Sequence, residues 1–294
     1  MIMYELVALN EQTYYINCPA KIGIYVRDPE HVYLIDSGND KDAGKKAWKL
    51  LTKNGWQLAG ILNTHSHADH IGGNHYLQTQ TGCKVFSGGI EGAFTRHPIL
   101  EPAFLYGGDP MKALRHKFLL AQDSDVTDFS DPAFPEEVQI IPLPGHSFDM
   151  VGYRTPDGTL FLADCVSSPE TLAKYAISFL YDVGAYLKTL DQVEAMEAAV
   201  FVPSHAQTTT DIRPLVQQNR AMVFAVADRL VEMCREPDSF ESLLQRTFAA
   251  YNLTMNFEQY VLVGSTVRSY LSWLSDQNRL YAFFENNCLL WHAL

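Results

Sequence analysis

The chain has few basic residues and no long apolar run. Its 294 residues include 22 lysines and arginines against 34 acidic residues, which gives a formal net charge of -12. Duplex nucleic acids select basic surfaces, so we expect no nucleic acid partner. No stretch approaches the ~18 consecutive apolar residues of a membrane span, and the N-terminus does not have the pattern of a secretory signal. We therefore expect a cytoplasmic protein without membrane association.

Cysteine is also scarce, and its distribution gives no sign of a disulfide framework. The five cysteines are dispersed and form no C-x-x-C pair, which favours reduced thiols packed in a core. The chain also lacks the G-x-S-x-G elbow, the P-loop and the G-x-G-x-x-G fingerprint. The chain therefore lacks the motifs that a serine hydrolase, a P-loop NTPase or a dinucleotide-binding enzyme needs.

Strand and helix patterns alternate through most of the chain. Over residues 1–211, short apolar strands alternate with helical segments, including a single helix predicted over residues 70–82, and this alternation predicts an α/β layered domain. Residues 92–131 interrupt the rhythm with prolines, aromatic residues and a G-G-D turn. Long segments of this kind commonly form binding loops or lids, so we expect an insertion in which Phe104 and Tyr106 wall the substrate pocket.

The remaining residues, 212–294, predict three helices followed by a hairpin. Asp238 and Glu241 stand at capping-box spacing, which predicts the start of the second helix, and Asn286 and Asn287 tolerate the positive φ of a tight turn. Helices followed by a hairpin are typical of a winged-helix-like end, but this segment holds eight acidic residues against seven arginines and offers no basic face. We expect it to pack on the layered domain, close one side of the pocket and support a homodimer.

Four residues of metal-ligand type stand within six positions of one segment. His65, His67, Asp69 and His70 form the pattern H-x-H-x-D-H in "ILNTHSHADHIGGN", directly after a predicted buried strand. Imidazole nitrogen and carboxylate oxygen are ligands that zinc accepts readily. The two glycines that follow let the backbone stay close to the site. The segment therefore predicts a metal site, although it holds too few ligands for two metals.

Three further candidate ligands stand where other apolar strands end. His146 follows "VQIIPLPG", Asp164 follows "TLFLA", and His205 follows "VFVPS". Open α/β sheets place their sites at the carboxyl ends of strands. We therefore expect these three side chains to join the H-x-H-x-D-H segment.

Five motifs occur in an order that is similar to a known family. They are "LIDSG" around Asp36, "THSHADH", "PGHS", "LFLADC" and "VPSH". With this series, over about residues 20 to 210, the chain resembles the metallo-β-lactamase superfamily. The resemblance implies an αββα sandwich with a metal cleft at one edge of two packed sheets, followed here by the C-terminal helical extension.

The resemblance also implies a dinuclear metal site, with two Zn²⁺ ions as the leading cofactors and Fe or Mn as alternatives. The implied ligands of one metal are His65, His67 and His146. The implied ligands of the second metal are Asp69, His70 and His205. Asp164 would bridge the two metals, and Asp36 would orient a ligand histidine from outside the ligand set.

The chemistry implied by such a site is hydrolysis. Two metals about 3.5–4 Å apart can share a hydroxide at neutral pH, so no serine or cysteine nucleophile is needed. Asp69 is the expected catalytic residue, because it would orient the hydroxide and receive its proton. Glyoxalase II-like thioesterases of this family share the ligand set and a helical C-terminal part. A small ester, thioester or lactone is therefore the expected substrate.

Departures from other branches of the family narrow this expectation. True β-lactamases of the related groups lack an aspartate corresponding to Asp164, and RNA-processing relatives carry basic exosites. Lactonase relatives carry a tyrosine shortly after the bridging aspartate, which "DCVSSPE" lacks. A phosphodiesterase and an iron-dependent persulfide dioxygenase remain alternatives, because the same ligand types accept iron. A binding module without activity is a third alternative.

Overall fold

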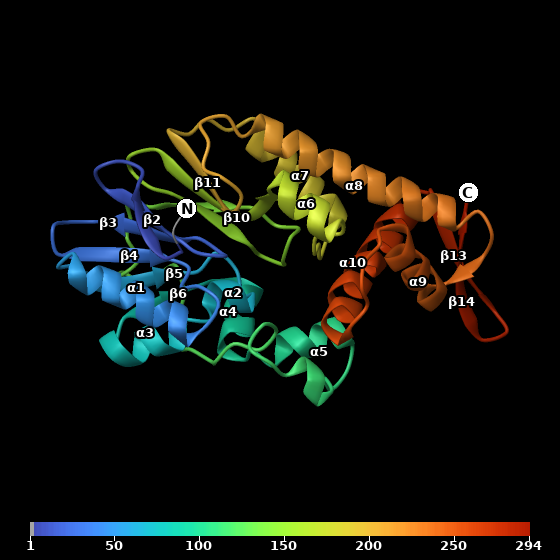
Figure 1. The fold of residues 1–294 in the computed structure, drawn as a ribbon, viewed down its shortest axis with the longest axis horizontal. Coiled ribbons are helices and arrows are strands. Elements are labelled where there is room, and N and C mark those ends of the chain that lie inside the picture. The colour runs from blue at the N-terminus through green and yellow to red at the C-terminus, as the bar shows by residue number, and fades with distance from the viewer. Residues whose placement is uncertain (1–2) are drawn as a thin grey trace.

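The computed structural model describes residues 3–294, in which two sheets and their helices precede a C-terminal helical part. In Figure 1 the sheets lie on the left and the C-terminal helices and hairpin lie on the right, with the long helix α8 (Arg213–Met233) running between them. Among residues 3–294, no helix is both long and apolar enough to cross a membrane.

The first sheet has seven strands in sequence order. They are β1 (Glu5–Ala8), β2 (Thr13–Asn17), β3 (Ile22–Val26), β4 (His31–Ile35), β5 (Gln57–Leu62), β6 (Lys84–Phe86) and β7 (Val126–Thr127). Neighbours from β1 to β4 are antiparallel, and neighbours from β4 to β7 are parallel. Helices α1 (Lys41–Lys53) and α3 (Asn74–Thr81) contribute Leu51 and Leu77 to a buried core with the sheet residue Ile24.

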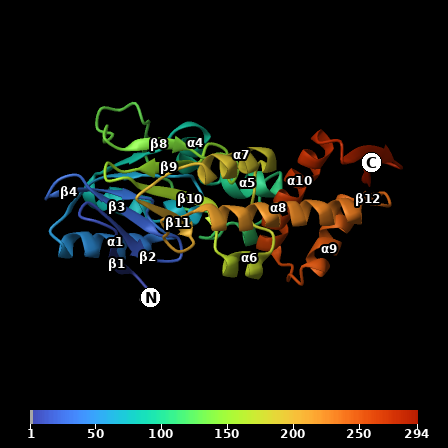
Figure 2. The ribbon, with the colours of Figure 1, turned by 90° about the horizontal axis from the view of Figure 1, so that it is seen from above.

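The second sheet has the strand order β11 (Val200–His205), β10 (Thr159–Ser167), β9 (Val151–Arg154) and β8 (Gln139–Pro142). Only β10 and β11 are parallel in it. A buried core that includes Phe86, Tyr153 and Phe161 fills the space between the two sheets. Helix α7 (Val183–Glu194) and α8 pack on the outer face of the second sheet and lead toward the C-terminal helices, as Figure 2 shows. The αββα sandwich predicted from the sequence is therefore confirmed.

The single helix predicted after the histidine segment is wrong. Helix α2 (Ala68–Ile71) ends before Gly72 and Gly73, and α3 begins after them. A Cβ at Gly72 would lie 2.4 Å from the carbonyl carbon of Asn39, and a Cβ at Gly73 would lie 2.4 Å from the oxygen of Ser37. The glycine pair thus lets the histidine segment pack directly against the loop after β4.

The insertion folds mainly as short helices. They are α4 (Gly89–Arg96), α5 (Leu100–Tyr106) and the 3-10 helix η1 (Lys112–Leu114), and the chain then returns to the first sheet through β7. Leu105, Leu114 and Leu119 of this segment form a small buried core with Val261 from the C-terminal part. The insertion and the C-terminal part therefore support one another. A further short helix, α6 (Pro169–Tyr175), follows the second sheet's strand β10.

The C-terminal part continues after α8 with β12 (Asp238–Ser239), α9 (Phe240–Ala250), α10 (Phe257–Asp276), β13 (Leu280–Glu285) and β14 (Cys288–Ala293). Its three strands have the order β12-β14-β13. The three helices and the closing hairpin predicted for this part are therefore present. The predicted turn is confirmed, because Asn286 and Asn287 have φ values of 50° and 61°.

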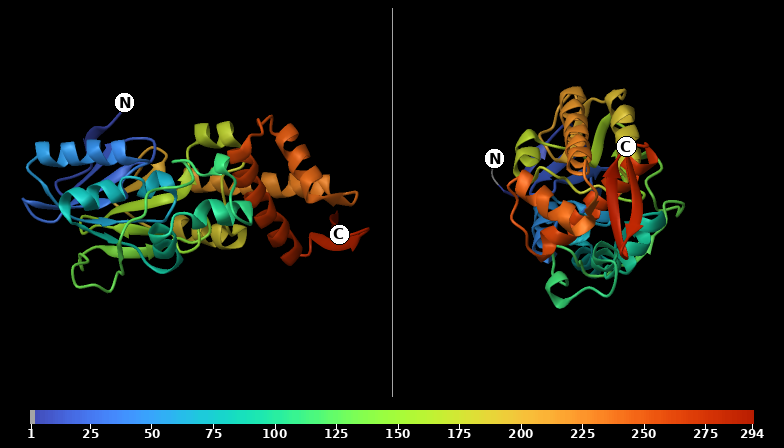
Figure 3. Two further views of the ribbon diagram at one scale, coloured as in Figure 1. Left: turned by 90° about the horizontal axis from the view of Figure 1, so that it is seen from below. Right: turned by 90° about the vertical axis from the view of Figure 1, so that its right-hand side faces the viewer.

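Two predictions for this part need correction. The side chain of Ser239, not Asp238, caps α9 by accepting a hydrogen bond from the backbone N–H of Ser242. The hairpin also does not bury all of its apolar side chains, because Phe284 is 78% and Leu289 is 39% exposed. Figure 3 shows why: the hairpin lies at the end of the molecule remote from the two sheets. The apolar stripe of α8, which includes Val223, Val226 and Leu230, is in contrast buried.

Candidate metal centre

Seven candidate ligands from both sheets meet at one edge of the sandwich. Four lie in the segment after β5, and the others come from the loop after β8, from β10 and from the end of β11. Their ligand atoms form two groups, in each of which all atoms lie within 4.8 Å of one another. The first group is His65, His67 and His146, and the second is Asp69, His70, Asp164 and His205. The structure thus brings together every candidate ligand predicted from the sequence.

The first group presents three imidazole nitrogens to a common point. Nδ1 of His67 lies 3.1 Å from Nε2 of His65 and 3.1 Å from Nε2 of His146. Burial lowers the pKa of His67 and of His146 to about 4, and it lowers the pKa of His65 well below its usual value. These imidazoles are therefore neutral at neutral pH, which is the form that binds a metal.

The second group mixes imidazoles with carboxylates. Nε2 of His70 lies 3.1 Å from Oδ1 of Asp164, and Nε2 of His205 lies 3.2 Å from Oδ2 of Asp164. Burial opposes the charged form, but Asp164 and Asp69 raise the pKa of His205 to about 10. Nε2 of His70 and Oδ1 of Asp164 are buried and have no hydrogen-bond partner. A cation would satisfy both atoms, so this donor set fits a divalent metal such as zinc.

Asp164 reaches both groups. Its Oδ2 also lies 3.5 Å from Nε2 of His146 in the first group. The residue before it, Ala163, has φ +50°, and the pairing of β10 with β11 shifts register on either side of Ala163. Such irregularities re-aim side chains at the ends of sheets. The structure therefore places Asp164 inside β10, between the two groups, and not beyond the end of the strand as predicted.

Asp36 lies directly behind the second group. Its Oδ2 is 2.8 Å from Nδ1 of His70, and the backbone N–H and hydroxyl of Thr64 donate hydrogen bonds to the same carboxylate at 2.8 Å each. Asp36 follows β4, and Thr64 follows the neighbouring strand β5. The carboxylate thus ties two strand ends together and holds the ring of His70, which is the position predicted for it.

Three other histidines of the two groups also have an acceptor at the nitrogen that faces away from the site. The pairs, each 3.0 Å apart, are His65 Nδ1 with Thr64 Oγ1, His146 Nδ1 with the oxygen of Phe179, and His205 Nδ1 with the oxygen of Pro19. Acceptors of this kind fix the tautomer and the ring orientation of metal-binding histidines. The site is therefore organised by its surroundings as well as by its ligands.

Two buried glutamates, Glu91 directly before the insertion and Glu101 within it, were not predicted as parts of the site. Glu91 on α4 accepts hydrogen bonds from Ser66 in the histidine segment and from Ser147 beside His146, so it joins the two loops that form the first group. Glu101 on α5 is 8% exposed, and burial, with the charges of Glu91 and Asp69, raises its pKa to about 8. A cation in the first group would favour its ionised form. No motif marks either residue in the sequence.

A cavity of about 660 Å³ opens over both groups. His67, Asp69, His146 and His205 line it, so the candidate ligands face an accessible space. Its apolar wall comes from several parts of the chain: Phe118 and Leu119 of the insertion, Ile177 and Phe179 after α6, and Leu262 and Val263 of α10. The C-terminal part therefore closes one side of the cavity, as predicted.

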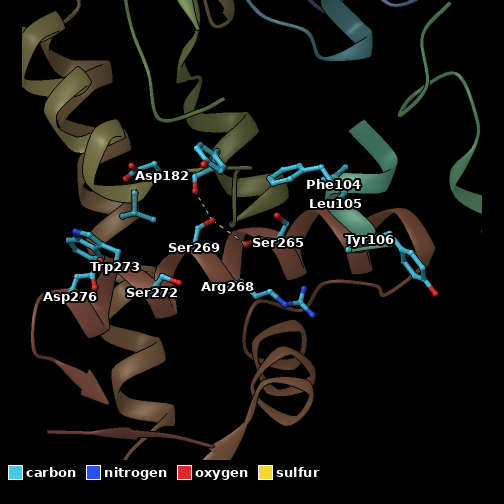
Figure 4. A pocket seen from close by; sticks show the side chains of 13 residues that line it. Phe104, Leu105, Tyr106, Asp182, Ser265, Arg268, Ser269, Ser272, Trp273 and Asp276 are labelled. Atoms are coloured by element: carbon cyan, nitrogen blue, oxygen red, sulfur yellow. Dashed lines mark hydrogen bonds between the residues drawn. The ribbon is translucent and has the colours of Figure 1, made fainter. Parts of the chain in front are cut away.

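Phe104 and Tyr106 do not line this cavity, which corrects the prediction that they wall the site. They line a second hollow of about 640 Å³ between α5, the start of α7 and α10. Figure 4 shows Phe104 and Tyr106 opposite Ser265, Arg268 and other side chains of α10. The insertion does wall the cavity at the candidate ligands, but through Glu101, Phe118 and Leu119.

The sequence profile of the Metallo-beta-lactamase superfamily matches residues 23–205. This span covers more than half of the chain and includes every candidate ligand. The chain belongs to the metallo-beta-lactamase superfamily. The two groups of candidate ligands at the sandwich edge thus lie within the part of the chain that the family profile matches.

Characterised relatives in this superfamily are hydroxyacylglutathione hydrolases. The protein from Rhizobium etli is 30% identical over 143 residues, which cover 48% of this chain and 46% of that protein. The protein from Maricaulis maris is 32% identical over 111 residues, which cover 37% of this chain and 34% of that protein. The chain thus spans less than half the length of these relatives in each match.

Solved structures of superfamily members show the same fold over the whole chain. A beta-lactamase domain protein from Burkholderia ambifaria has a TM-score of 0.75 at 15% identity and covers 99% of this chain and 95% of its own. A metallo-beta-lactamase family protein from Thermus thermophilus has a TM-score of 0.73 at 18% identity, with coverage of 98% and 100%. Metallo-beta-lactamase SMB-1 covers only 75% of this chain, with a TM-score of 0.54. The C-terminal part is therefore a shared feature of the first two folds.

Proposed function

We propose that this chain is a dinuclear zinc hydrolase that acts on a small ester, thioester or lactone. The observation that carries the proposal is the convergence of two groups of ligand atoms, each within 4.8 Å, at one open cavity. Two bound zinc ions would supply a nucleophilic water at neutral pH and polarise the bond that is cut. The first group and the second group would each hold one ion, with Asp164 between them.

Asp69 is the proposed catalytic residue. Its side chain is 42% exposed, whereas that of Asp164 is 10% exposed, so Asp69 is the carboxylate of the second group that most faces the cavity. Burial opposes ionisation, but the charges of His70 and His205 hold the pKa of Asp69 below its usual range. Such a carboxylate is a weak base, so the proposed part of Asp69 is to orient the attacking water, and it would receive a proton only from a water that bound zinc makes more acidic.

The charge of the cavity wall favours a neutral substrate. Of the described residues that line the cavity, Lys174 is the one lysine or arginine, while Glu101, Glu170 and Glu258 add carboxylates outside the ligand set. A nucleic acid or another polyanion needs a basic wall. We therefore place an ester or thioester ahead of a phosphodiester. The hydroxyacylglutathione hydrolases among the relatives support a thioester.

Metal analysis and a substrate panel test the proposal together. The chain is purified and its zinc, iron and manganese are measured, and it is then assayed with acyl thioesters, acyl esters, lactones and a phosphodiester. We expect about two zinc ions per chain and hydrolysis of one uncharged class, lost on chelation and in Asp164→Ala. Hydrolysis of the phosphodiester alone would replace the proposal by a phosphodiesterase. Bound iron, together with oxygen uptake when a persulfide is added, would replace it by a persulfide dioxygenase.

We also propose that the protein acts in the cytoplasm. All five cysteines are free thiols, and four of them are buried. Free thiols of this kind are typical of reducing compartments. Fractionation of the native host, followed by detection of the protein, is the direct test.

The last part of the proposal is a homodimer formed through the hairpin. Phe284, Leu289 and Tyr281 are exposed on β13 and β14, which together leave an apolar surface at the end of the molecule. Apolar surface of this kind commonly marks a contact with another protein. A second copy of the chain would cover it without contacting the cavity.

A further inference from the structure

The histidines of the two groups differ in what holds their outward-facing nitrogen. His65, His70, His146 and His205 each have a protein acceptor within 3.0 Å of that nitrogen. His67 is the remaining histidine, and it differs also in presenting Nδ1, not Nε2, to its group. The nitrogen of His67 that faces away from its group is therefore Nε2.

The group that faces Nε2 of His67 is the carboxylate of Glu101. Oε1 of Glu101 lies 3.6 Å from Nε2, and the side chains of His67 and Glu101 are 15% and 11% exposed. This distance is beyond the ~3.2 Å limit of an ordinary N–H···O hydrogen bond, so the hydrogen bond requires the carboxylate to move closer to the ring. Glu101 thus stands where the other four histidines have their acceptors.

We propose that Glu101 is a positioning residue that accepts a hydrogen bond from Nε2–H of His67 and so directs Nδ1 toward the metal. The proposal rests on the metal site of the proposed function and adds a role for the insertion. Carboxylate partners fix the tautomer of a ligand histidine and raise its basicity. With Glu101 in this role, all five histidines of the site have an outer acceptor.

The burial of Glu101 agrees with this role. The carboxylates of Glu91 and Asp69 act on Glu101 with charge of its own sign, and no lysine or arginine of the described residues forms an ion pair with it. A buried carboxylate without a positive partner is costly. A divalent cation in the first group, together with Nε2–H of His67, would supply the missing compensation.

The packing of α5 explains how Glu101 is held in place. Leu105 lies one helical turn after Glu101, and it belongs to the buried core that the insertion shares with Val261 of α10. Residues four apart share one face of a helix, so the packed face of α5 fixes the direction of Glu101. The C-terminal part thus supports His67 indirectly, although it contributes no candidate ligand.

Zinc binding by the full-length, metal-free chain tests this role without any substrate. Zinc affinities are measured by competition with a chelator for wild type, Glu101→Gln and Glu101→Ala. Gln keeps the size of the side chain and an acceptor oxygen but removes the charge. The matched control is Glu258→Gln, which lies in the first turn of α10 and lines the same cavity but forms no ion pair with the described candidate ligands.

We expect one of the two zinc affinities to fall by about 10-fold in Glu101→Gln and by up to about 100-fold in Glu101→Ala. The affinities of Glu258→Gln should equal those of wild type. The thermal midpoint of the metal-free Glu101→Gln chain should also equal that of wild type, because the side chain keeps its volume. At saturating zinc, the kcat of the Glu101 variants should return part of the way to the wild-type value. Their KM should equal that of wild type.

Wild-type zinc affinity in the Glu101 variants would overturn the role. If Glu101→Ala does not fold, a folded Glu101→Gln chain with unchanged zinc affinity is sufficient to overturn it. A raised KM with unchanged zinc affinity would assign Glu101 to substrate contact instead. A wild-type chain that binds no zinc would overturn both this inference and the proposed function. The expected loss of zinc affinity would support the inference even if no substrate of the panel is hydrolysed, which separates the two.

Discussion

The sandwich and the C-terminal part contribute to the same cavity in different ways. Every candidate ligand comes from the sandwich, within residues 65–205, whereas the C-terminal part supplies Glu258, Gln259, Leu262 and Val263 to the wall. The reason lies in the backbone: strand ends of packed sheets meet at one edge and can aim short side chains at a point. A helix such as α10 offers one face, which suits a wall better than a metal site.

The two parts are nevertheless not independent bodies. One buried core contains Leu160 and Leu162 of β10 and Leu190 of α7 together with Val223 and Leu274 of the C-terminal part. A second, smaller core joins the insertion to α10. The difference between the parts is thus one of chemical role, and the predictions below test how far this division holds.

The largest expected effect is the loss of a ligand from the sandwich. His67→Ala and Asp164→Ala should each lower bound metal and reduce hydrolysis to the limit of detection, because each removes a donor from a group of three or four. Elemental analysis and the substrate panel measure both effects, and circular dichroism checks the fold. The control is His31→Ala, whose ring pairs with Asp28 on the surface. Full activity in His67→Ala would contradict the assignment of His67 as a metal ligand.

Removal of the C-terminal part should be nearly as damaging, but through stability. A chain that ends near Thr210 would expose the face of α7 and β10 that packs in the shared core. We expect it to be insoluble or to unfold without a cooperative transition. The point variant Leu230→Ala, at a side chain that is 1% exposed, should lower the free energy of unfolding by about 2–5 kcal/mol. A soluble, fully active truncated chain would show that the two parts are separable.

Asp36→Asn should produce an intermediate effect that complements the Glu101 variants. The carboxylate of Asp36 contacts His70 in the second group, so one zinc affinity should fall by about 10- to 100-fold. Chelator competition measures it. Because Glu101 faces the first group, the two variants should weaken different binding steps, and the double variant should weaken both. If Asp36→Asn and Glu101→Gln weaken the same zinc-binding step, Asp36 and Glu101 do not act on different groups, and the assignment is contradicted.

A change in the wall should leave the metal in place. Leu262→Ala removes part of the α10 wall of the cavity, so KM should change several-fold while zinc content stays at the wild-type value. Steady-state kinetics and elemental analysis are compared with Phe257→Ala, a control whose side chain is 59% exposed at the start of α10. Loss of zinc in Leu262→Ala would mean that the wall also holds the metal site.

The smallest effect on activity is expected at the hairpin. Phe284→Ser removes the most exposed of its large apolar side chains, 78% exposed, and should shift the mass in solution from dimer toward monomer. Light scattering measures the mass, and kcat/KM should not change, because no residue of β13 or β14 lines the cavity. The hairpin lies at the end of the molecule remote from the two sheets (Figure 1). A wild-type chain that is already monomeric would refute the homodimer.

Several features of this protein were predictable from the sequence. The alternation of apolar strands and helices predicted an α/β layered domain, and the resemblance to the metallo-β-lactamase superfamily implied the sandwich. The position of each candidate ligand near a strand end predicted that they meet. Asp36 was expected behind a histidine, and it lies 2.8 Å from Nδ1 of His70. The turn at Asn286 and Asn287 was also predicted. Each of these features is marked by a short motif or a local pattern of residue types, and strand ends of packed sheets bring such motifs together at one edge.

Other features were decided by the tertiary structure alone. Glu91 and Glu101 lie on α4 and α5, in segments without a motif, and they reach the site only because these helices fold back over it. The glycine pair separates α2 from α3, and only the fold shows that the backbone of Ser37 and Asn39 occupies the space that a Cβ would need there. Phe104 and Tyr106 were placed in the wrong hollow for the same reason. Contacts between segments far apart in the chain depend on how whole elements pack, so the sequence determined the ligands, and the fold decided which side chains hold and enclose them.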